Sequence, residues 1–153
     1  MARYILDTGI LIGYLRGAQF AAYVEQHYSP FNSPNIAATS VVTVGELHSL
    51  AMQLNWGEEK RKSLAELLLR IPSVSINRSD IIERYAEIDA FSLGKHPTKI
   101  LATSSRSVGK NDLWIAATAS VIDALLLTTD ADFDHLNGVF LPVVYIDQSL
   151  KPI

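Results

Sequence analysis

Short apolar segments alternate along this chain with segments in which apolar residues recur at helical spacing. Arg3–Leu6 and Leu125–Leu127 have the length and composition of buried strands, whereas Leu47–Leu54 and Leu64–Ile71 place leucines on one helical face. Strands that alternate with helices favour a parallel sheet covered on both sides. We therefore predict an α/β fold, a three-layer α/β/α sandwich with a mainly parallel central sheet, built from residues 1–153 as a single domain.

The element boundaries follow from turn residues and from breaks in periodicity. The expected strands are Arg3–Leu6, Ile36–Val42 with its turn, Val74–Ile76, Leu125–Leu127 and Val143–Ile146. The expected helices cover residues 20–27, 47–54, 58–71, 79–93 and 112–122, with Ser79-Asp80 as the cap of the fourth. Residues 92–111 are polar and free of acids, which predicts a long loop.

Four acidic residues border the apolar segments: Asp7, Glu46, Asp112 and Asp130. A carboxylate among core-forming residues is costly to bury unless something pairs with it. In a parallel sheet, the carboxyl ends of strands and the starts of the following helices share one edge, so the four should meet there. Without a counter-ion they would repel one another and raise their pKa values. Oxygen ligands without histidine or cysteine select hard cations, which predicts a Mg²⁺ or Mn²⁺ site.

Each of these acids also has a structural explanation when it is taken singly. Glu46 lies three residues after Thr43, at the spacing of a capping box. Asp112 at a helix start is favoured by the helix dipole, and Asp7 and Asp130 suit turns. These alternatives stay open one by one, but they leave the joint arrangement unexplained.

Composition restricts the partners and the chemistry. The chain has no cysteine, which excludes thiol catalysis, disulfides and cysteine-zinc sites. A net charge of −3 means that nucleic acid must be bound through a local basic patch. No basic leader precedes the first strand, and no apolar run approaches the roughly 20 residues that span a bilayer. We therefore expect a cytoplasmic protein with no membrane partner.

Four segments together resemble the PIN-domain family of ribonucleases, and especially the toxins of VapBC toxin–antitoxin pairs. The segments are Leu6-Asp7-Thr8-Gly9-Ile10-Leu11-Ile12, Ser40-Val41-Val42-Thr43-Val44-Gly45-Glu46-Leu47, Asn111-Asp112-Leu113-Trp114-Ile115-Ala116-Ala117-Thr118-Ala119 and Leu127-Thr128-Thr129-Asp130-Ala131-Asp132-Phe133. Their order and spacing extend over nearly the whole chain. The resemblance implies a metal-dependent endoribonuclease, the toxin of such a pair, with RNA as substrate and an antitoxin protein as partner.

The resemblance also implies roles for particular residues. Asp7, Glu46, Asp112 and Asp130 would form the catalytic, metal-binding quartet, with Asp132 a weaker auxiliary ligand, and Thr8 and Asn111 would support the site. A bound divalent ion lowers the pKa of water and stabilises charge on the scissile phosphate. The chain departs from the family pattern in two places. Gly9 stands where asparagine or serine is common, and the segment that leads to Asp112 is long.

Five basic residues are candidates for contacts with RNA phosphates: Arg16, Lys95, Lys99, Arg106 and Lys110. Four of them lie in the acid-free loop before Asp112, among serines and threonines. Such residues position a strand without reading its sequence. The structural alternative for this segment is a solvated loop.

Other functions fit the sequence less well. Asp7-Thr8-Gly9 also occurs in aspartic proteases, but that fold is almost all-β and would leave Asp112 and Asp130 without a role. The remaining alternative is a non-catalytic or RNA-processing PIN-like module that binds RNA or protein. Apolar helices around Leu64–Ile71 and Ile81–Ile88, with charged residues at only 19%, favour a homodimer.

Overall fold

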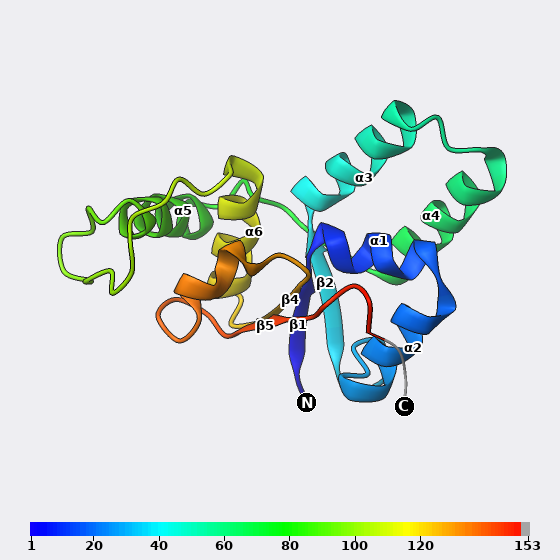
Figure 1. Ribbon diagram of the computed structural model, residues 1–153, viewed down its shortest axis with the longest axis horizontal. Coiled ribbons are helices and arrows are strands. Elements are labelled where there is room, and N and C mark those ends of the chain that lie inside the picture. Colours follow the sequence, from blue (N-terminus) through cyan, green and yellow to red (C-terminus); the bar gives the residue numbers. More distant parts are fainter. Residues whose placement is uncertain (151–153) are drawn as a thin grey trace.

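The computed structural model describes residues 1–150, and its centre is a five-stranded, entirely parallel sheet (Figure 1). The strands are β1 (Arg3–Leu6), β2 (Ile36–Ser40), β3 (Ser73–Val74), β4 (Leu125–Thr128) and β5 (Val143–Tyr145). They lie in the order β3-β2-β1-β4-β5. After β1, strands β2 and β3 are added on one side of it, and β4 and β5 are then added on the other side. The predicted parallel α/β class is confirmed, and the topology reverses between β1 and β4.

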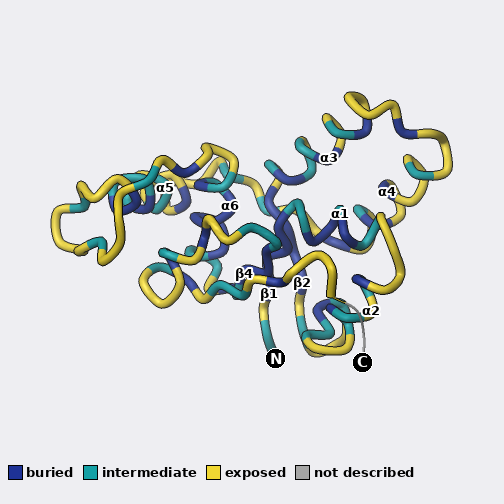
Figure 2. Tube along the Cα trace, in the orientation of Figure 1, coloured by how far each residue is buried: buried dark blue, intermediate teal, exposed yellow. Residues whose placement is uncertain are grey.

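Side chains alternate along the strands between two hydrophobic cores. In β1, Ile5 enters one core and its neighbours Tyr4 and Leu6 enter the other. In β4, Leu126 and Leu127 divide in the same way. This period of two is what a sheet covered on both faces requires. Buried residues concentrate along the strands and the inner sides of the helices (Figure 2).

The helices form the two outer layers of the predicted sandwich. They are α1 (Thr8–Arg16), α2 (Ala18–His27), α3 (Val41–Gln53), α4 (Glu58–Arg70), α5 (Ser79–Ser92), α6 (Lys110–Val121) and the short 3₁₀ helix η1 (Ala131–Leu136). Residues of α1 to α4 supply one core, and residues of α5, α6 and η1 supply the other. The three-layer prediction is therefore confirmed. Within residues 1–150, no helix has the length and apolar character needed to cross a membrane.

Helix α3 begins earlier than the sequence pattern predicted. Ser40 is its N-cap, and the Ser40 hydroxyl accepts a hydrogen bond of 3.1 Å from the Val42 amide. Thr43 is therefore inside the helix and fully buried, so the capping-box explanation for Glu46 is wrong. The helix start is set by the end of β2, and Glu46 consequently lies in the second turn.

The start of α6 and the cap of α5 also differ from the prediction. Helix α6 begins at Lys110 rather than at Asp112, which places Asp112 inside its first turn. The predicted cap of α5 is also wrong, because Arg78 holds the N-cap position. Asp80 instead accepts a 2.9 Å bond from the Ile81 amide and pairs with Arg78 at 2.7 Å. Residues 93–109 contain no helix or strand, as expected of a loop.

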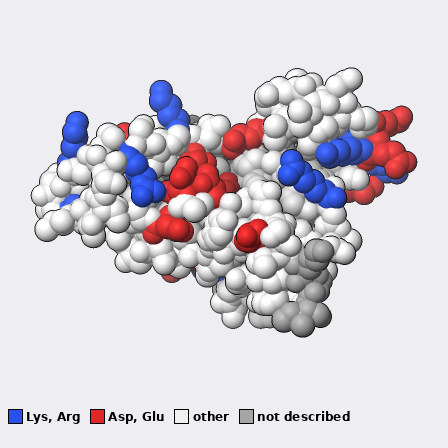
Figure 3. Space-filling model, in the orientation of Figure 1, with Lys and Arg blue, Asp and Glu red and all other residues white. Residues whose placement is uncertain are grey.

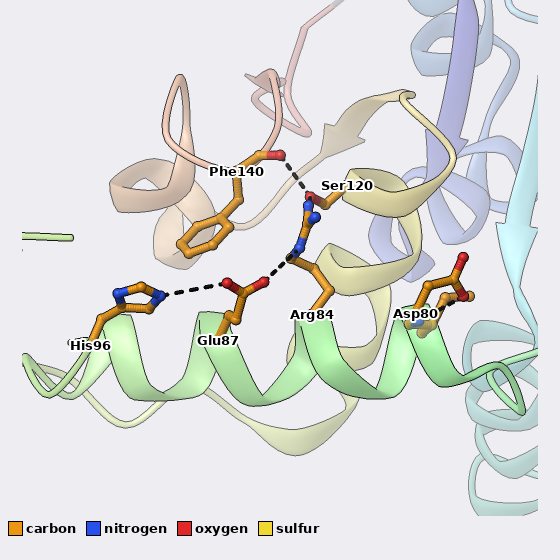
Figure 4. A network of polar contacts seen from close by, with 7 residues as sticks. Asp80, Arg84, Glu87, His96, Ser120 and Phe140 are labelled. Atoms are coloured by element: carbon orange, nitrogen blue, oxygen red, sulfur yellow. Dashed lines mark hydrogen bonds and ion pairs between the residues drawn. The ribbon is translucent and has the colours of Figure 1, made fainter. Parts of the chain in front are cut away.

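A polar network holds this long loop against the lobe formed by α5 and α6 (Figure 4). Arg84 of α5 donates to Glu87 at 3.0 Å and also contacts the hydroxyl of Ser120 on α6. Ser120 in turn donates to the carbonyl of Phe140 at 2.7 Å. His96, near the start of the loop, lies 3.6 Å from Glu87. The base of the loop is thus tied to α5, on the side of the lobe that carries Phe140.

Candidate functional site

The four acids predicted from the sequence line one pocket at the carboxyl edge of the sheet. Asp7 follows β1 and Asp130 follows β4, while Glu46 comes from α3 and Asp112 from α6. The pocket has a volume of about 370 Å³ and lies where the topology reverses, the place at which open α/β sheets bind ligands. Acidic side chains gather at the centre of the face shown in Figure 3, with lysines and arginines to either side.

Asp7 is the most buried of the four, with only 5% of its surface exposed. It is the N-cap of α1, and its carboxylate accepts a 2.7 Å bond from the Thr8 amide and a 2.6 Å bond from the Thr128 hydroxyl. Burial raises the pKa of Asp7 to about 6, with a further contribution from the nearby charges of Glu46 and Asp130. The two hydrogen bonds act against this rise because they stabilise the ionised form.

Thr128 connects Asp7 to the strand that carries Asp130. Its hydroxyl donates to Asp7 and accepts a 3.0 Å bond from the backbone amide of Asp130. Since Thr128 is fully buried, its side chain has no competing water. The Thr128 hydroxyl therefore fixes Asp7 and Asp130 relative to each other at the ends of β1 and β4.

The pKa of Asp112 rises further than that of Asp7. Partial burial in the first turn of α6 raises its pKa to about 7, and the charges of Asp7, Asp130 and Glu46 add to the rise. Burial and the neighbouring negative charges thus favour the neutral form of this carboxyl group when no cation is bound. The site behaves as a cluster of like charges that one bound proton partly neutralises.

Glu46 is held by the threonine that the resemblance assigned to a supporting role. The Thr8 hydroxyl donates to Glu46 at 2.9 Å and lies 3.1 Å from the hydroxyl of Thr43. Thr43 and Glu46 lie on neighbouring turns of α3, so Thr8 connects the start of α1 to the acidic face of α3. Thr43 therefore contributes to the site through its hydroxyl, and not as a cap.

Gly9 departs from the family pattern because another residue occupies the space that its side chain would need. A Cβ atom built on Gly9 would lie 1.9 Å from the Thr129 hydroxyl oxygen. That hydroxyl accepts a 3.2 Å bond from the side-chain amide of Gln148, which also borders the acid pocket. Gly9 thus allows Thr129 and Gln148 to form part of the pocket wall.

Two predicted auxiliary residues lie at the margin of the site. Asp132 is exposed, its amide donates to Asp130 at 2.9 Å, and its charge contributes to the raised pKa of Asp112. It does not border the acid pocket itself. Asn111 is exposed and lines a neighbouring groove on α3.

The five basic candidates do not line the acid pocket. Lys99 lies over the ring of Phe140, with its ammonium nitrogen 5.5 Å from the ring centre. Arg106 is half-buried and near enough to His135 for its charge to lower the pKa of that imidazole. Lys110 is exposed, two residues before Asp112, and Arg16 ends α1. Lys110 thus lies on the helix that carries Asp112, and Arg106 lies in the last part of the loop that leads to this helix.

Sequence reasoning missed Thr128 and Gln148. A signal for Thr128 was present, because it is a polar residue at the end of an otherwise apolar strand and immediately precedes the Thr129-Asp130 pair. Gln148 gave no comparable signal. It follows the last strand, and only the tertiary structure brings it to Thr129.

The donor chemistry of the pocket fits a hard divalent cation. Four carboxylates border it without histidine or cysteine, and their mutual repulsion is relieved by positive charge. Among residues 1–150, however, no three acidic, histidine or cysteine side chains stand close enough to enclose an ion. The oxygen ligands are present, but their side chains are not arranged as a closed cage.

Comparison with known families identifies the architecture. Residues 4–139 match the family model of the PIN domain, and this stretch contains all four acids. The chain belongs to the PIN domain family. The resemblance inferred from the four PIN-like segments is thereby confirmed. No curated protein sequence matches the chain.

Solved structures share this PIN fold over almost their full length. VapBC2 from Rickettsia felis, bound to a DNA fragment from its promoter, has a TM-score of 0.72 at 19% identity, covering 95% of this chain and 99% of that one. VapBC-1 from nontypeable Haemophilus influenzae has a TM-score of 0.69 at 21% identity, covering 96% and 98%. VapBC-5 from Mycobacterium tuberculosis, a member of the VapBC family of toxin–antitoxin systems, has a TM-score of 0.65 at 23% identity, covering 95% and 100%. At these identities, the likeness shows the fold.

Proposed function

We propose that this PIN-domain protein is a Mg²⁺- or Mn²⁺-dependent endoribonuclease and the toxin of a type II toxin–antitoxin pair. The observation that carries the proposal is the convergence of Asp7, Glu46, Asp112 and Asp130 in one pocket at the point where the sheet topology reverses. Four separate elements supply these side chains, and burial together with their repulsion raises the pKa of Asp112 to about 7. A structural role for each acid separately does not require such an arrangement.

The residues of the pocket have distinct parts in the proposed reaction. Asp7, Asp112 and Asp130 would hold the cation, with Asp132 as an auxiliary. When bound, a divalent ion activates water and stabilises negative charge on the scissile phosphate. Thr128 keeps the Asp7 carboxylate oriented through its 2.6 Å bond. Thr8 does the same for Glu46, which would bind the cation or orient the attacking water.

The proposed partners are RNA, an antitoxin protein and a second copy of this chain. The structural neighbours include toxin–antitoxin assemblies, which supports the antitoxin. A basic side chain of such a partner would complement the four acids and compete with the cation. The basic residues Arg16, Lys95, Lys99, Arg106 and Lys110 remain candidates for phosphate binding.

One observation favours a second candidate, a PIN-like module that binds RNA or protein without cutting it. In the described part of the chain, the acidic side chains are not assembled into a three-ligand cluster. Such a module would keep the fold and the acidic pocket but would neither require divalent metal nor lose RNA affinity when one acid is neutralised.

Cleavage and metal binding by matched variants test the proposal. Asp7→Asn and Asp112→Asn should abolish metal-dependent RNA cleavage while the fold persists, since asparagine is as good an N-cap as aspartate at position 7. Mg²⁺ or Mn²⁺ should raise the melting temperature of the wild type by preferential binding to the folded state. Asp123→Asn is the control, because Asp123 is exposed and has a positive φ of 57°, a conformation that asparagine tolerates. Normal cleavage by the two site variants would overturn the proposal.

A further inference from the structure

A second groove opens along α3, next to the acid pocket. It has a volume of about 540 Å³, and its walls include Val42, Gly45 and Leu50 of α3 and Asn111 of α6. Glu46 borders both this groove and the acid pocket. On the α6 side, Asn111 of the groove is next in sequence to Asp112 of the acid pocket. The groove and the acid pocket thus lie side by side along α3 and the start of α6, with Glu46 between them.

Gly45 is unusual because nothing in the fold requires a glycine there. It lies inside α3, where glycine is among the poorest helix formers. No atom lies within 4 Å of a Cβ built at this position, and its φ is not in the left-handed region. Gly9 and Gly13 differ, since a Cβ there would meet Thr129 or Phe20. A side chain at position 45 would extend into the groove beside Glu46.

The walls of the groove indicate the chemistry of its occupant. Val42 and Leu50 are half-buried and offer apolar surface, while Asn111 and Gln53 carry amides at the margin. Among the described residues that line the groove there is no lysine or arginine, so it does not suit a phosphate. An apolar slot with amide donors and acceptors suits an uncharged, planar heterocycle. A nucleobase has this chemistry.

We infer that the groove is a nucleobase subsite, kept open by Gly45, for the nucleotide next to the bond cleaved at the acid pocket. This inference rests on the proposed ribonuclease function, because an RNA strand with its phosphate at the acids continues directly along α3. The connection through Glu46 favours such a strand over a second protein copy as the occupant. Gly45 acts by leaving space, and it carries no chemistry of its own.

Filling the groove tests this subsite. Gly45→Leu should raise KM for a single-stranded RNA cut at one mapped bond on the order of tenfold, because the base can no longer pack against the apolar wall. Its melting temperature should not fall, since leucine is the better helix former. Gly45→Ala is the smaller step, with a smaller increase in KM. Ala65→Leu is the matched control, because Ala65 is an exposed position inside α4, also changes from a small residue to leucine, and lies outside the groove.

An abasic scan of the same RNA distinguishes a base-binding subsite from a general obstruction. In the wild type, removing the base at one position beside the cleaved bond should raise KM by a similar factor. In Gly45→Leu, the same removal should have no further effect, because the leucine already keeps the base out of the groove. An unchanged KM and an unchanged scan in Gly45→Leu would overturn the subsite while leaving the ribonuclease proposal intact.

Two further outcomes are also decisive. If Gly45→Leu changes only the oligomeric state measured by light scattering, the groove is covered by a second copy and the nucleobase subsite is wrong. If the wild type and Ala65→Leu cut no RNA in the presence of Mg²⁺ or Mn²⁺, the ribonuclease proposal fails and the subsite fails with it.

Discussion

Asp112 is the residue whose ionisation depends most on the fold. Its pKa rises from an ordinary 3.8 to about 7, so the folded protein holds a proton that the unfolded chain releases over this interval. The free energy of unfolding contributed by this group therefore falls as pH rises through the interval and levels off above the folded pKa. Asp7, with a pKa of about 6, acts in the same direction.

This linkage predicts a pH-dependent stability for the metal-free protein. The melting temperature of the wild type should decline relative to that of Asp112→Asn between about pH 4 and pH 7. Mg²⁺ should raise the wild-type melting temperature more at the upper end of this range, where protons no longer compete for the carboxylates. Differential scanning calorimetry across the range measures both effects. Parallel pH curves for the two proteins would contradict the raised pKa of Asp112.

Gly9 gives a second prediction at the residue scale. Alanine normally stabilises a helix relative to glycine, but here its Cβ would meet the Thr129 hydroxyl at 1.9 Å. Gly9→Ala should therefore lower the free energy of unfolding by roughly 1–2 kcal/mol, because Thr129 is displaced and its bond with Gln148 is broken. Chemical denaturation of Gly9→Ala, Thr129→Ala and the double variant measures this coupling. The double variant should recover part of the stability, and additive effects would show that the two sites are independent.

At the scale of elements, the loop of residues 93–109 divides into two parts. Its first part is tied to α5 through His96 and Glu87 (Figure 4). Lys99 in this part lies over the ring of Phe140. Its last part leads directly to the first turn of α6, which carries Asp112. Arg106 and Lys110 are therefore the better candidates for guiding a strand to the acids than Lys95 and Lys99.

Substitution in pairs tests this division of the loop. Replacing all four basic residues by alanine should weaken RNA binding and flatten its salt dependence, by roughly one unit of slope for each phosphate that is no longer neutralised. Arg106→Ala with Lys110→Ala should account for most of the change, and Lys95→Ala with Lys99→Ala for less. Metal affinity should remain unchanged in every variant because none of these groups is a ligand. Equal RNA affinity and slope in all variants would mean that the segment is a solvated loop.

At the scale of the whole molecule, most of the apolar surface expected to form a dimer is used within the chain. Leu64, Leu67 and Ile71 pack in one core, and Ile81 and Ile88 pack in the other. Leu69 and Ile82 remain exposed, at 87% and 47%. They lie on α4 and α5, which occupy opposite sides of the molecule (Figure 1). The two helices therefore present separate, small apolar surfaces.

The homodimer remains a prediction that light scattering at micromolar concentration checks. We expect a dimer, and we expect Leu69→Lys or Ile82→Lys to dissociate it according to which helix lies at the interface. Each substitution leaves the cores intact because both side chains are exposed. A wild-type monomer at that concentration would contradict the prediction.

The sequence alone was enough to predict the parallel α/β class and the meeting of four acids at one edge of the sheet. Both inferences depend on local patterns, namely the periodicity of apolar residues and the position of an acid relative to the end of a strand or the start of a helix. The positions of Asp7 and Asp130 could be predicted in this way because each follows a strand with a continuous apolar run. Because β1 and β4 are parallel neighbours in the sheet, the residues that follow them lie close together, however the side chains pack.

Only the tertiary structure decided how these acids are held and what surrounds them. The bond from Thr128 to Asp7 joins residues 121 positions apart, and Gln148 reaches Thr129 from beyond the last strand. The start of α3 at Val41, with Ser40 as its N-cap, depends on where β2 ends in the sheet. The groove at Gly45 likewise needs a wall from α6. Contacts between distant segments are set by how whole elements pack, and no local pattern in the sequence records them.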